Sequence, residues 1–432
     1  MTFLLILTAL IAFLYTGLPM FAGMFLFSCG VLLLVEGNIA TLGEFVFGKL
    51  NVYLLVAIPL FMLMSHFMVR GKVVDDLYAT AHTLTRHLPG GLAVATVFAC
   101  SVFAAISGSS VATALTIGKV AIPQMLKYNY DRRGIYGVVA GGGTLGILIP
   151  PSAPMVLYGF VSDTSIGALF MAGVLPGIMM ALIFAAYCMG VEYRREKIVP
   201  GYVRPERASL PEAGRAVRQS FWALTLPPFV LGGMYFGIFT ATEAAGTGAL
   251  WALAIAWLIY RNFTWKDLWD GGMEAARTSA VLFMIIIGAG LFGYMLTKLN
   301  IPQEAVRLAL EYQLSQTGFM VVMMLLILVL GLILESISII LITTPVILPV
   351  MTALGIDKVW YGVLLTINLE LALISPPVGM NLIVIKSITK APLAEIDKAA
   401  IPYILMLILG IAVIIAFPQI ALWLPSTMDY RS

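Results

Sequence analysis

Charged residues are scarce in this chain of 432 residues, since Asp, Glu, Lys and Arg together make up only 11% of it. Soluble domains carry roughly a quarter of such residues, so an ordinary soluble protein is excluded. The formal net charge is only +3, which leaves no basic surface for a nucleic-acid partner. Hydrophobic residues make up 61% and recur in apolar runs, many of about 18 residues or more, each able to cross a bilayer. Because backbone groups in lipid must satisfy one another, we predict an all-α polytopic membrane protein surrounded by membrane lipid.

Cysteines and catalytic motifs are equally sparse. Cys29, Cys100 and Cys188 stand alone within apolar runs, so neither a disulfide nor a metal–thiolate site is expected. The three histidines are also separated, and structural roles are expected for them. No Gly-x-x-x-x-Gly-Lys-Ser/Thr loop, Ser/His/Asp set or His-Glu-x-x-His motif argues for nucleotide hydrolysis or enzyme chemistry, so a protein that is not an enzyme is expected. The N-terminus lacks a basic stretch and a cleavage site, which favours a retained span.

What the chain does contain is a long internal repeat. A shift of 226 residues aligns prolines and polar positions of the two halves. The aligned prolines are Pro123 with Pro349, Pro150 with Pro376, Pro151 with Pro377, and Pro176 with Pro402. Paired interruptions of hydrophobic helices in corresponding halves are typical of transporters with a site between the repeats.

Each half contains a long apolar segment with a polar centre that would break a helix. The first segment spans 92–126 and is interrupted at 107–110, and the second spans 316–354 and is interrupted at 335–338. An arm of about 15 residues reaches only about 22 Å as a helix, which is too short to cross. We therefore predict two re-entrant helical hairpins whose tips lie at membrane depth, lined by protein or water.

Each hairpin is followed by a helix that is broken at a Pro-Pro pair. These broken helices are expected at 134–165 and 359–385. The segment 192–220 carries seven Lys or Arg, which places it in the cytoplasm by the positive-inside rule. Four full spans then separate the two broken helices, so these helices point in opposite directions and the repeats are inverted.

The predicted organisation has six parts. They are scaffold helices and an amphipathic arm (1–91), a first transport repeat (92–191), a cytoplasmic basic loop (192–220), scaffold helices (221–297), a second transport repeat (298–424) and a C-terminal tail (425–432). Residues 3–35 are expected to form one kinked helix or two short ones, and 401–424 are expected to form the last span.

The Pro-Pro breaks predict cation sites. Proline removes the amide donor, so carbonyls of the preceding turn lose their partners, and a hard cation such as Na⁺ can satisfy them. We infer at least two Na⁺ sites, one in each repeat. The first set of ligands is Ser107, Gly108, Ser110, Gly146, Ile149 and Pro151. The second set is Ser336, Ser338, Ala372, Ser375 and Pro377, with Asn368 and Asn381 flanking the break. The alternative is that these breaks only kink helices and allow close packing.

Charged side chains at membrane depth are costly and therefore indicate function. Glu335 lies at the second tip and Glu370 lies within a span. Either could ligate a cation, carry a proton or accept a substrate hydroxyl, and Glu370 could equally be a structural carboxylate. Lys298 closes an apolar run and could bind a carboxylate or extend to the interface. Glu243 follows Thr240 at the spacing of a helix cap, and that role is expected for it.

Three motifs carry a resemblance to a known family. They are Phe103-Ala-Ala-Ile-Ser-Gly-Ser-Ser-Val-Ala-Thr113, Gly141-Gly-Gly-Thr-Leu-Gly-Ile-Leu-Ile-Pro-Pro-Ser152 and Leu373-Ile-Ser-Pro-Pro-Val-Gly-Met-Asn381. With these motifs the chain resembles, over essentially its whole length, the large membrane subunit of tripartite ATP-independent periplasmic (TRAP) transporters.

The resemblance implies an elevator-type transporter in the bacterial inner membrane, with a mobile transport domain made of the hairpins and broken helices. It also implies Na⁺-driven symport, a separate small four-helix membrane subunit and a soluble periplasmic binding protein. The expected substrate is a small organic anion such as a C4-dicarboxylate or sialic acid, held between the tips near Ser152, Lys298 and Glu335. Lys298 and Glu335 match a basic and an acidic residue near the second hairpin of relatives.

Two other readings of the sequence remain. A stand-alone sodium- or proton-coupled carrier or antiporter would transport without any binding protein. A channel or a membrane-embedded enzyme would need polar pore rings or a catalytic constellation, and the sequence contains neither.

Overall fold

The computed structural model describes residues 8–9, 12–13, 17–37, 42–71, 73–198, 205–332 and 334–428. Within these ranges the ordered elements are all helices, in agreement with the predicted all-α class. Seven of the described helical segments are long and apolar enough to cross a membrane. These segments fit the predicted multi-pass membrane protein.

The helices of the first half are α2 (Met20–Glu36), α3 (Leu42–Leu50), η1 (Tyr53–Val56), α4 (Ala57–Arg70), α5 (Val73–Thr85), α6 (Gly91–Ser107), α7 (Ser110–Lys127), α8 (Arg132–Leu148), α9 (Ala153–Ser162) and α10 (Ile166–Ile198). Those of the second half are α11 (Leu210–Tyr235), α12 (Ala241–Ala254), η2 (Ile255–Ile259), α13 (Trp265–Lys298), α14 (Ile301–Glu311), α15 (Gln316–Gly331), α16 (Ser336–Leu354), α17 (Lys358–Leu373), α18 (Met380–Thr389), α19 (Leu393–Ala416) and α20 (Gln419–Ser426).

The 226-residue spacing of the sequence repeat is also the spacing of the helices. The five helices α6 to α10 begin at positions that correspond, within one residue, to the starts of α15 to α19. The Pro150–Pro151 and Pro376–Pro377 peptide bonds are both cis. Each half therefore contains the same series: a helix pair with a short tip, then a helix in two pieces, then a long helix.

Local chemistry explains where the tips and breaks fall. At the first tip (107–110), Gly108 ends α6 with a φ of 61°, and the Ser109 hydroxyl caps α7 by accepting a hydrogen bond from the Ala112 amide. At the first break (149–152), Pro150 and Pro151 supply no amide hydrogens, so α8 stops at Leu148. The second tip (335–338) and the second break (374–379) occupy the corresponding positions between α15 and α16 and between α17 and α18.

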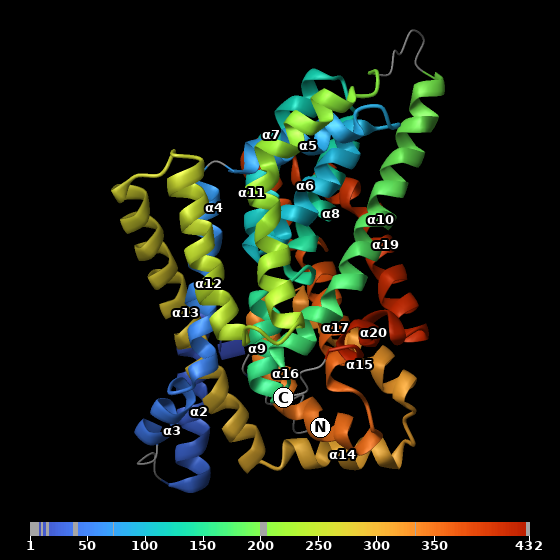
Figure 1. Ribbon diagram of the computed structural model, residues 1–432. Helices are drawn as coiled ribbons and strands as arrows, with labels where there is room; N and C mark the ends of the chain where they lie inside the picture. The colour runs from blue at the N-terminus through green and yellow to red at the C-terminus, as the bar shows by residue number, and fades with distance from the viewer. Residues whose placement is uncertain are drawn as a thin grey trace.

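The helices form two groups that lie side by side (Figure 1). α13 packs against α2 and α4, and α12 packs against α4, on one side of the molecule. The pair α6–α7 lies toward the upper end in this view, whereas α14, α15 and α16 lie toward the lower end. The two helix pairs therefore approach the middle of the molecule from different ends.

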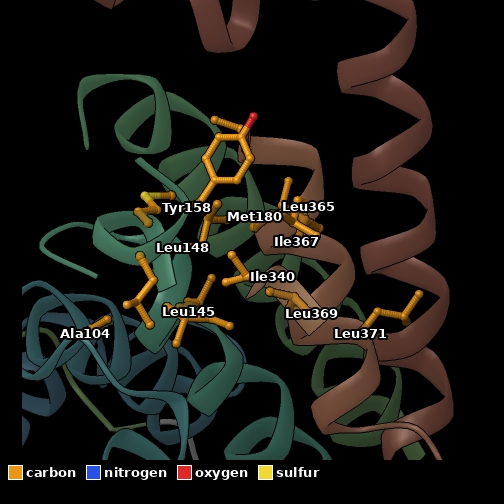
Figure 2. Packing of buried hydrophobic residues seen from close by; sticks show 14 of the residues in the cluster. Ala104, Leu145, Leu148, Tyr158, Met180, Ile340, Leu365, Ile367, Leu369 and Leu371 are labelled. Carbon is orange, nitrogen blue, oxygen red and sulfur yellow. The ribbon is translucent and has the colours of Figure 1, made fainter. Parts of the chain in front are cut away.

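The core lies where the two broken helices meet. Figure 2 shows Leu145 and Leu148 of α8 beside Ile340 of α16 and Leu369 of α17, and all four side chains are buried. In a membrane, such side chains hold the two halves together by close van der Waals packing rather than by removal from water. The two breaks are thus held in one packed unit.

The basic segment 192–220 is mostly helical, which corrects its assignment as a loop. α10 continues to Ile198 and α11 starts at Leu210, because the segment is rich in Arg, Glu and Ala, which favour helix. Arg86 donates to both carboxylate oxygens of Glu212 in the first turn of α11, at 2.7 and 2.8 Å. This guanidinium holds the pKa of Glu212 below its usual range.

The expected last span, 401–424, is also interrupted. α19 ends at Ala416 and α20 starts at Gln419, because Pro418 has no amide hydrogen and forces Phe417 out of the helical region. At the other end of the chain, α2 starts directly after Pro19, as the expected break in 3–35 requires. Most of 3–16, and residues 429–432 of the expected tail, lie outside the described residues.

Candidate functional site

The first tip lies directly against the first break. A Cβ placed on Gly108 would lie 2.6 Å from the carbonyl oxygen of Pro151, and one placed on Gly146 would lie 2.5 Å from that of Ser109. Real Cβ atoms do not approach an oxygen so closely, so glycine is required at both positions. The sequence-predicted residues of the first cation site, from Ser107 to Ser110 with Gly146 and Pro151, are thus brought together.

Carbonyl groups at the first break lack backbone partners. The amides that would normally bond the carbonyls of Gly146 and Ile147 belong to Pro150 and Pro151, which have no amide hydrogen. The carbonyl of Ile149 accepts no hydrogen bond from the described residues. Unpaired buried carbonyls are costly, and an oxygen-ligated cation would satisfy them. The donor set therefore fits a hard cation.

The hydroxyl of Ser110 connects the two halves of the chain. It donates to the carbonyl of Gly143 in α8 at 3.0 Å and accepts from the Asn381 side-chain amide in α18 at 2.7 Å. Asn381 therefore contributes to the first cluster, although its sequence position flanks the second break. Its carbonyl oxygen is buried and has no partner among the described groups, so it remains available to a ligand.

The other hydroxyls of the first tip are satisfied locally. Thr113 Oγ1 donates to the Ser109 carbonyl at 2.8 Å and lies 2.8 Å from Ser107 Oγ. These bonds hold the start of α7 in place without any ligand. The first tip therefore has its own internal hydrogen-bond network.

The second tip and second break enclose a cavity of about 200 Å³. Glu335 and Ser336 line it from the tip, and Ala372 lines it from the end of α17. The Ser336 hydroxyl makes no hydrogen bond with the described residues. Two residues of the second cation set, Ser336 and Ala372, thus line one cavity together with Glu335, which was assigned to substrate.

The remaining residues of the second set lie around this cavity rather than in its lining. Ser375 Oγ donates to the Leu371 carbonyl at 2.6 Å, and Asn368 donates to the Met324 carbonyl of α15 at 2.6 Å. Ser338 is buried and its hydroxyl has no partner. Pro377 removes the partner of the Leu373 carbonyl, as Pro151 does in the first break.

The three residues assigned to substrate do not share a cavity. Ser152 follows the first break, is 1% exposed, and its hydroxyl has no partner among the described groups. Lys298 forms an ion pair with Glu36 at 2.7 Å and lies 5.2 Å from the ring centroid of Tyr294. Its ammonium is therefore already engaged, whereas Glu335 faces the cavity of the second tip.

Two other carboxylates, Glu243 and Glu370, lie in contrasting surroundings. Glu243 forms a capping box with Thr240 at the start of α12, which confirms the expected helix cap. Glu370 is fully buried in α17, and neither of its oxygens has a hydrogen-bond partner among the described groups. Glu370 is therefore a carboxyl enclosed by the core close to the end of α8, where the backbone of Leu148 approaches it.

A further cavity of about 180 Å³ separates the first tip from α4 and α13. Ser107 and Ser109 line it on one side, and Ser65, His66 and Thr278 line it on the other. His66 Nδ1 lies 3.6 Å from the Glu274 carboxylate of α13. This arrangement places polar groups of the predicted scaffold opposite the first cluster.

The geometry agrees with what comparison with known proteins finds. A family model described as "Tripartite ATP-independent periplasmic transporter, DctM component" matches residues 7–420. The chain belongs to this family. It is 37% identical over 396 residues to the C4-dicarboxylate TRAP transporter large permease protein DctM of Pseudomonas aeruginosa, with 92% of each chain covered. It is 30% identical over 415 residues to the sialic acid TRAP transporter large permease protein SiaM of Vibrio cholerae, covering 95% of this chain and 96% of that one.

A solved transporter structure shares the fold of this TRAP permease. The Alcanivorax borkumensis YdaH transporter aligns with a TM-score of 0.65 and 14% sequence identity, over 89% of this chain and 88% of that chain. At this identity the match concerns the fold alone. These two relatives are transporter permeases, which fits the lack of catalytic motifs in the sequence.

Sequence reasoning missed several residues of this permease that line the cavities. His66 was expected to be structural, and Ser65 and Thr278 were not singled out, yet all three face the first tip. No local pattern marks them, because their position depends on how α4 and α13 pack. Only their polar character inside apolar spans could have drawn attention to them.

Proposed function

We propose that this large TRAP permease subunit imports a small organic carboxylate together with Na⁺ by an elevator movement. The observation that supports coupling most strongly is the pair of Pro-Pro breaks. At the first break, two carbonyls lose their helical amide partners beside a serine-bearing tip. At the second break, Pro377 removes the partner of the Leu373 carbonyl, while the Ala372 carbonyl accepts from the Ser375 amide at 3.2 Å. Oxygen donors without a fixed positive charge suit Na⁺, and a related arrangement occurs in each half.

The elevator movement is supported by the arrangement of the helices. The pairs α6–α7 and α15–α16 lie toward opposite ends of the molecule (Figure 1), as inverted repeats with re-entrant hairpins would. The two breaks share one packed core, so they would move as a unit against α2, α4, α12 and α13. The basic segment between α10 and α11 would face the cytoplasm of a bacterial inner membrane.

Substrate and cation binding are expected to be coupled through the tips. Filling the unpaired carbonyl and hydroxyl positions would order the second tip and so complete the substrate site beside it. By linkage, Na⁺ would then raise the affinity for substrate, and substrate would raise the affinity for Na⁺ by the same factor.

The substrate class and the partners follow from the relatives. The names of the relatives specify a C4-dicarboxylate and sialic acid, both of which carry carboxylates. We infer that this permease acts with a small four-helix membrane subunit and with a periplasmic binding protein that delivers the anion. Because the binding protein meets the substrate first, it would set much of the specificity.

Reconstitution tests the proposal. The permease, its small subunit and the binding protein are placed in proteoliposomes, and uptake of labelled succinate or sialic acid is measured with and without an inward Na⁺ gradient. We expect uptake only with the gradient and only with the binding protein. Equal uptake without Na⁺ would refute symport, and uptake without binding protein would refute the tripartite arrangement.

A further inference from the structure

The largest cavity described in the permease lies away from both tips. Its volume is about 670 Å³, within the range of small-molecule sites. α3 and α13 form one wall, with Lys49, Gly290, Tyr294 and Thr297, and α9 and α16 form the other, with Phe160 and Pro345. The walls therefore come from the predicted scaffold and from both predicted transport repeats.

Among the residues that line this cavity, Lys49 is the one with a formally charged side chain. Its ammonium has no carboxylate within ion-pair distance among the described residues, and it lies 5.6 Å from the ring centroid of Phe45. Lys298, near the end of α13, is by contrast neutralised by Glu36 at 2.7 Å. The fold thus supplies an acid to one of these lysines and leaves the other facing an apolar cavity without a counter-charge. Such a cation attracts an anion from outside the chain.

Gly290 in the same wall makes room for this lysine. A Cβ on Gly290 would lie 3.6 to 3.8 Å from three carbons of the Lys49 side chain, so that side chain runs along the bare backbone of α13. Lys49 is exposed, and its stem contacts α13 on one side while the residue lines the cavity. Thr297 and Tyr294 add a few polar atoms to walls that are otherwise apolar. One placed charge in an apolar cavity is the usual composition of a site for an organic anion.

We propose that this cavity binds a carboxylate or another oxyanion, with Lys49 as its counter-charge. It lies toward the end of the molecule that carries α14 and α16, opposite the basic segment, so it would receive anions from the periplasmic side. The assignment to transported substrate rests on the proposed function, whereas binding of an oxyanion does not. The same chemistry is presented by a free dicarboxylate and by the headgroup of an anionic phospholipid.

Chemical labelling tests the site without any transport. The full chain with its small subunit is placed in nanodiscs, and the rate at which an amine-reactive ester modifies each lysine is measured by peptide mass spectrometry. Succinate at millimolar concentration in phosphatidylcholine discs is expected to slow modification of Lys49 about tenfold and to leave Lys266 unchanged. If phosphatidylglycerol slows the modification of Lys49 and succinate does not, the cavity is an oxyanion site whose ligand is a lipid headgroup. Equal rates in phosphatidylcholine, with succinate and with phosphatidylglycerol overturn the proposal.

Uptake then separates this site from the general function. In proteoliposomes, Lys49→Met is expected to raise the KM for succinate about tenfold while changing the maximal rate less, because the lost contact is to the anion. Lys49→Arg should keep most of the affinity, and Lys266→Met, which lies outside the cavity, should behave as the wild type. Normal Na⁺-dependent uptake with an unchanged KM in Lys49→Met overturns the role in substrate binding and leaves the proposed function intact. If the wild type shows no uptake, the proposed function fails, and the labelling result alone decides the site.

Discussion

The two tips of this permease contact their helix breaks in different ways. At the first tip, backbone meets backbone at Gly108 and Gly146, and Ser110 bonds both α8 and α18. At the second tip, Glu335 and Ser336 border an open cavity, and the hydroxyl of Ser338 has no partner. Equivalent positions of the repeat thus make direct hydrogen bonds between segments in one half and border a cavity in the other. We infer that the first cluster is preorganised and that ligand binding does most of its ordering at the second.

Of the substitutions considered, Gly146→Ala is expected to have the largest effect on stability and uptake. The added methyl group would collide with the Ser109 carbonyl and separate the first tip from its break, at a cost of about 1–3 kcal/mol in stability. Uptake in proteoliposomes should be lost, and the melting temperature should fall. Gly272→Ala is the matched control, because a Cβ there meets nothing within 4 Å. Normal uptake by Gly146→Ala would contradict the conclusion that the first tip is closely packed against its break.

Ser110→Ala and Ser336→Ala compare equivalent serines of the two tips. Removing the Ser110 hydroxyl leaves the buried Asn381 amide and the Gly143 carbonyl without this partner, which costs about 1–3 kcal/mol. Ser336 makes no such bonds, so its loss should cost less than about 0.5 kcal/mol in sodium-free buffer. Denaturant or thermal unfolding of both variants measures the difference. Equal costs would contradict the proposed asymmetry of the tips.

Thr144 and Glu370 occupy equivalent positions of the two repeats and extend the comparison into the helices. Thr144 donates to the Gly141 carbonyl at 2.7 Å, whereas the Glu370 oxygens have no partner. Replacing a buried, unpaired carboxyl by an apolar side chain of similar size removes a desolvation cost, so Glu370→Met should raise stability by about 1 kcal/mol. Thr144→Val should not raise it. A fall in the melting temperature of Glu370→Met would show that the carboxyl is satisfied in the membrane.

The smallest effect on stability is expected from Ser338→Ala. Its hydroxyl is buried and unpaired, so its removal in sodium-free buffer should be neutral or stabilising by up to about 1 kcal/mol. Under the proposed coupling, the stabilisation that Na⁺ gives the wild type should shrink in this variant. Thermal unfolding across a Na⁺ series measures both quantities. An unchanged response to Na⁺ would remove Ser338 from the second cation site.

The breaks and tips were predictable because their causes are local. Gly108 and the aligned Pro-Pro pairs at Pro150 and Pro376 are local signals that recur in register, so the sequence alone located both tips and both breaks to within a few residues. The interruption at Pro418 has the same cause and was missed because it falls inside a long apolar run. The helical extent of 192–220 was not predicted, because the charge of this segment was used only to place it in the cytoplasm.

The contacts between distant segments were not predictable in the same way. Asn381 reaches Ser110 across 271 residues, and Glu36 neutralises Lys298 from α2. Sequence spacing says nothing about which helix faces which, so the ligand sets were divided by repeat and Lys298 was assigned to substrate. The cavities of His66 and Lys49 depend on the same packing of α3, α4 and α13.

The bond between Asn381 and Ser110 also bears on how this chain can be divided. A gene split between α10 and α11 would yield one fragment with the whole first tip and another with Asn381. The first fragment would keep every residue of the first break but would lose the amide that Ser110 accepts from. Neither fragment would carry a complete cluster, so activity should return only when the two are produced together and assemble in the same membrane.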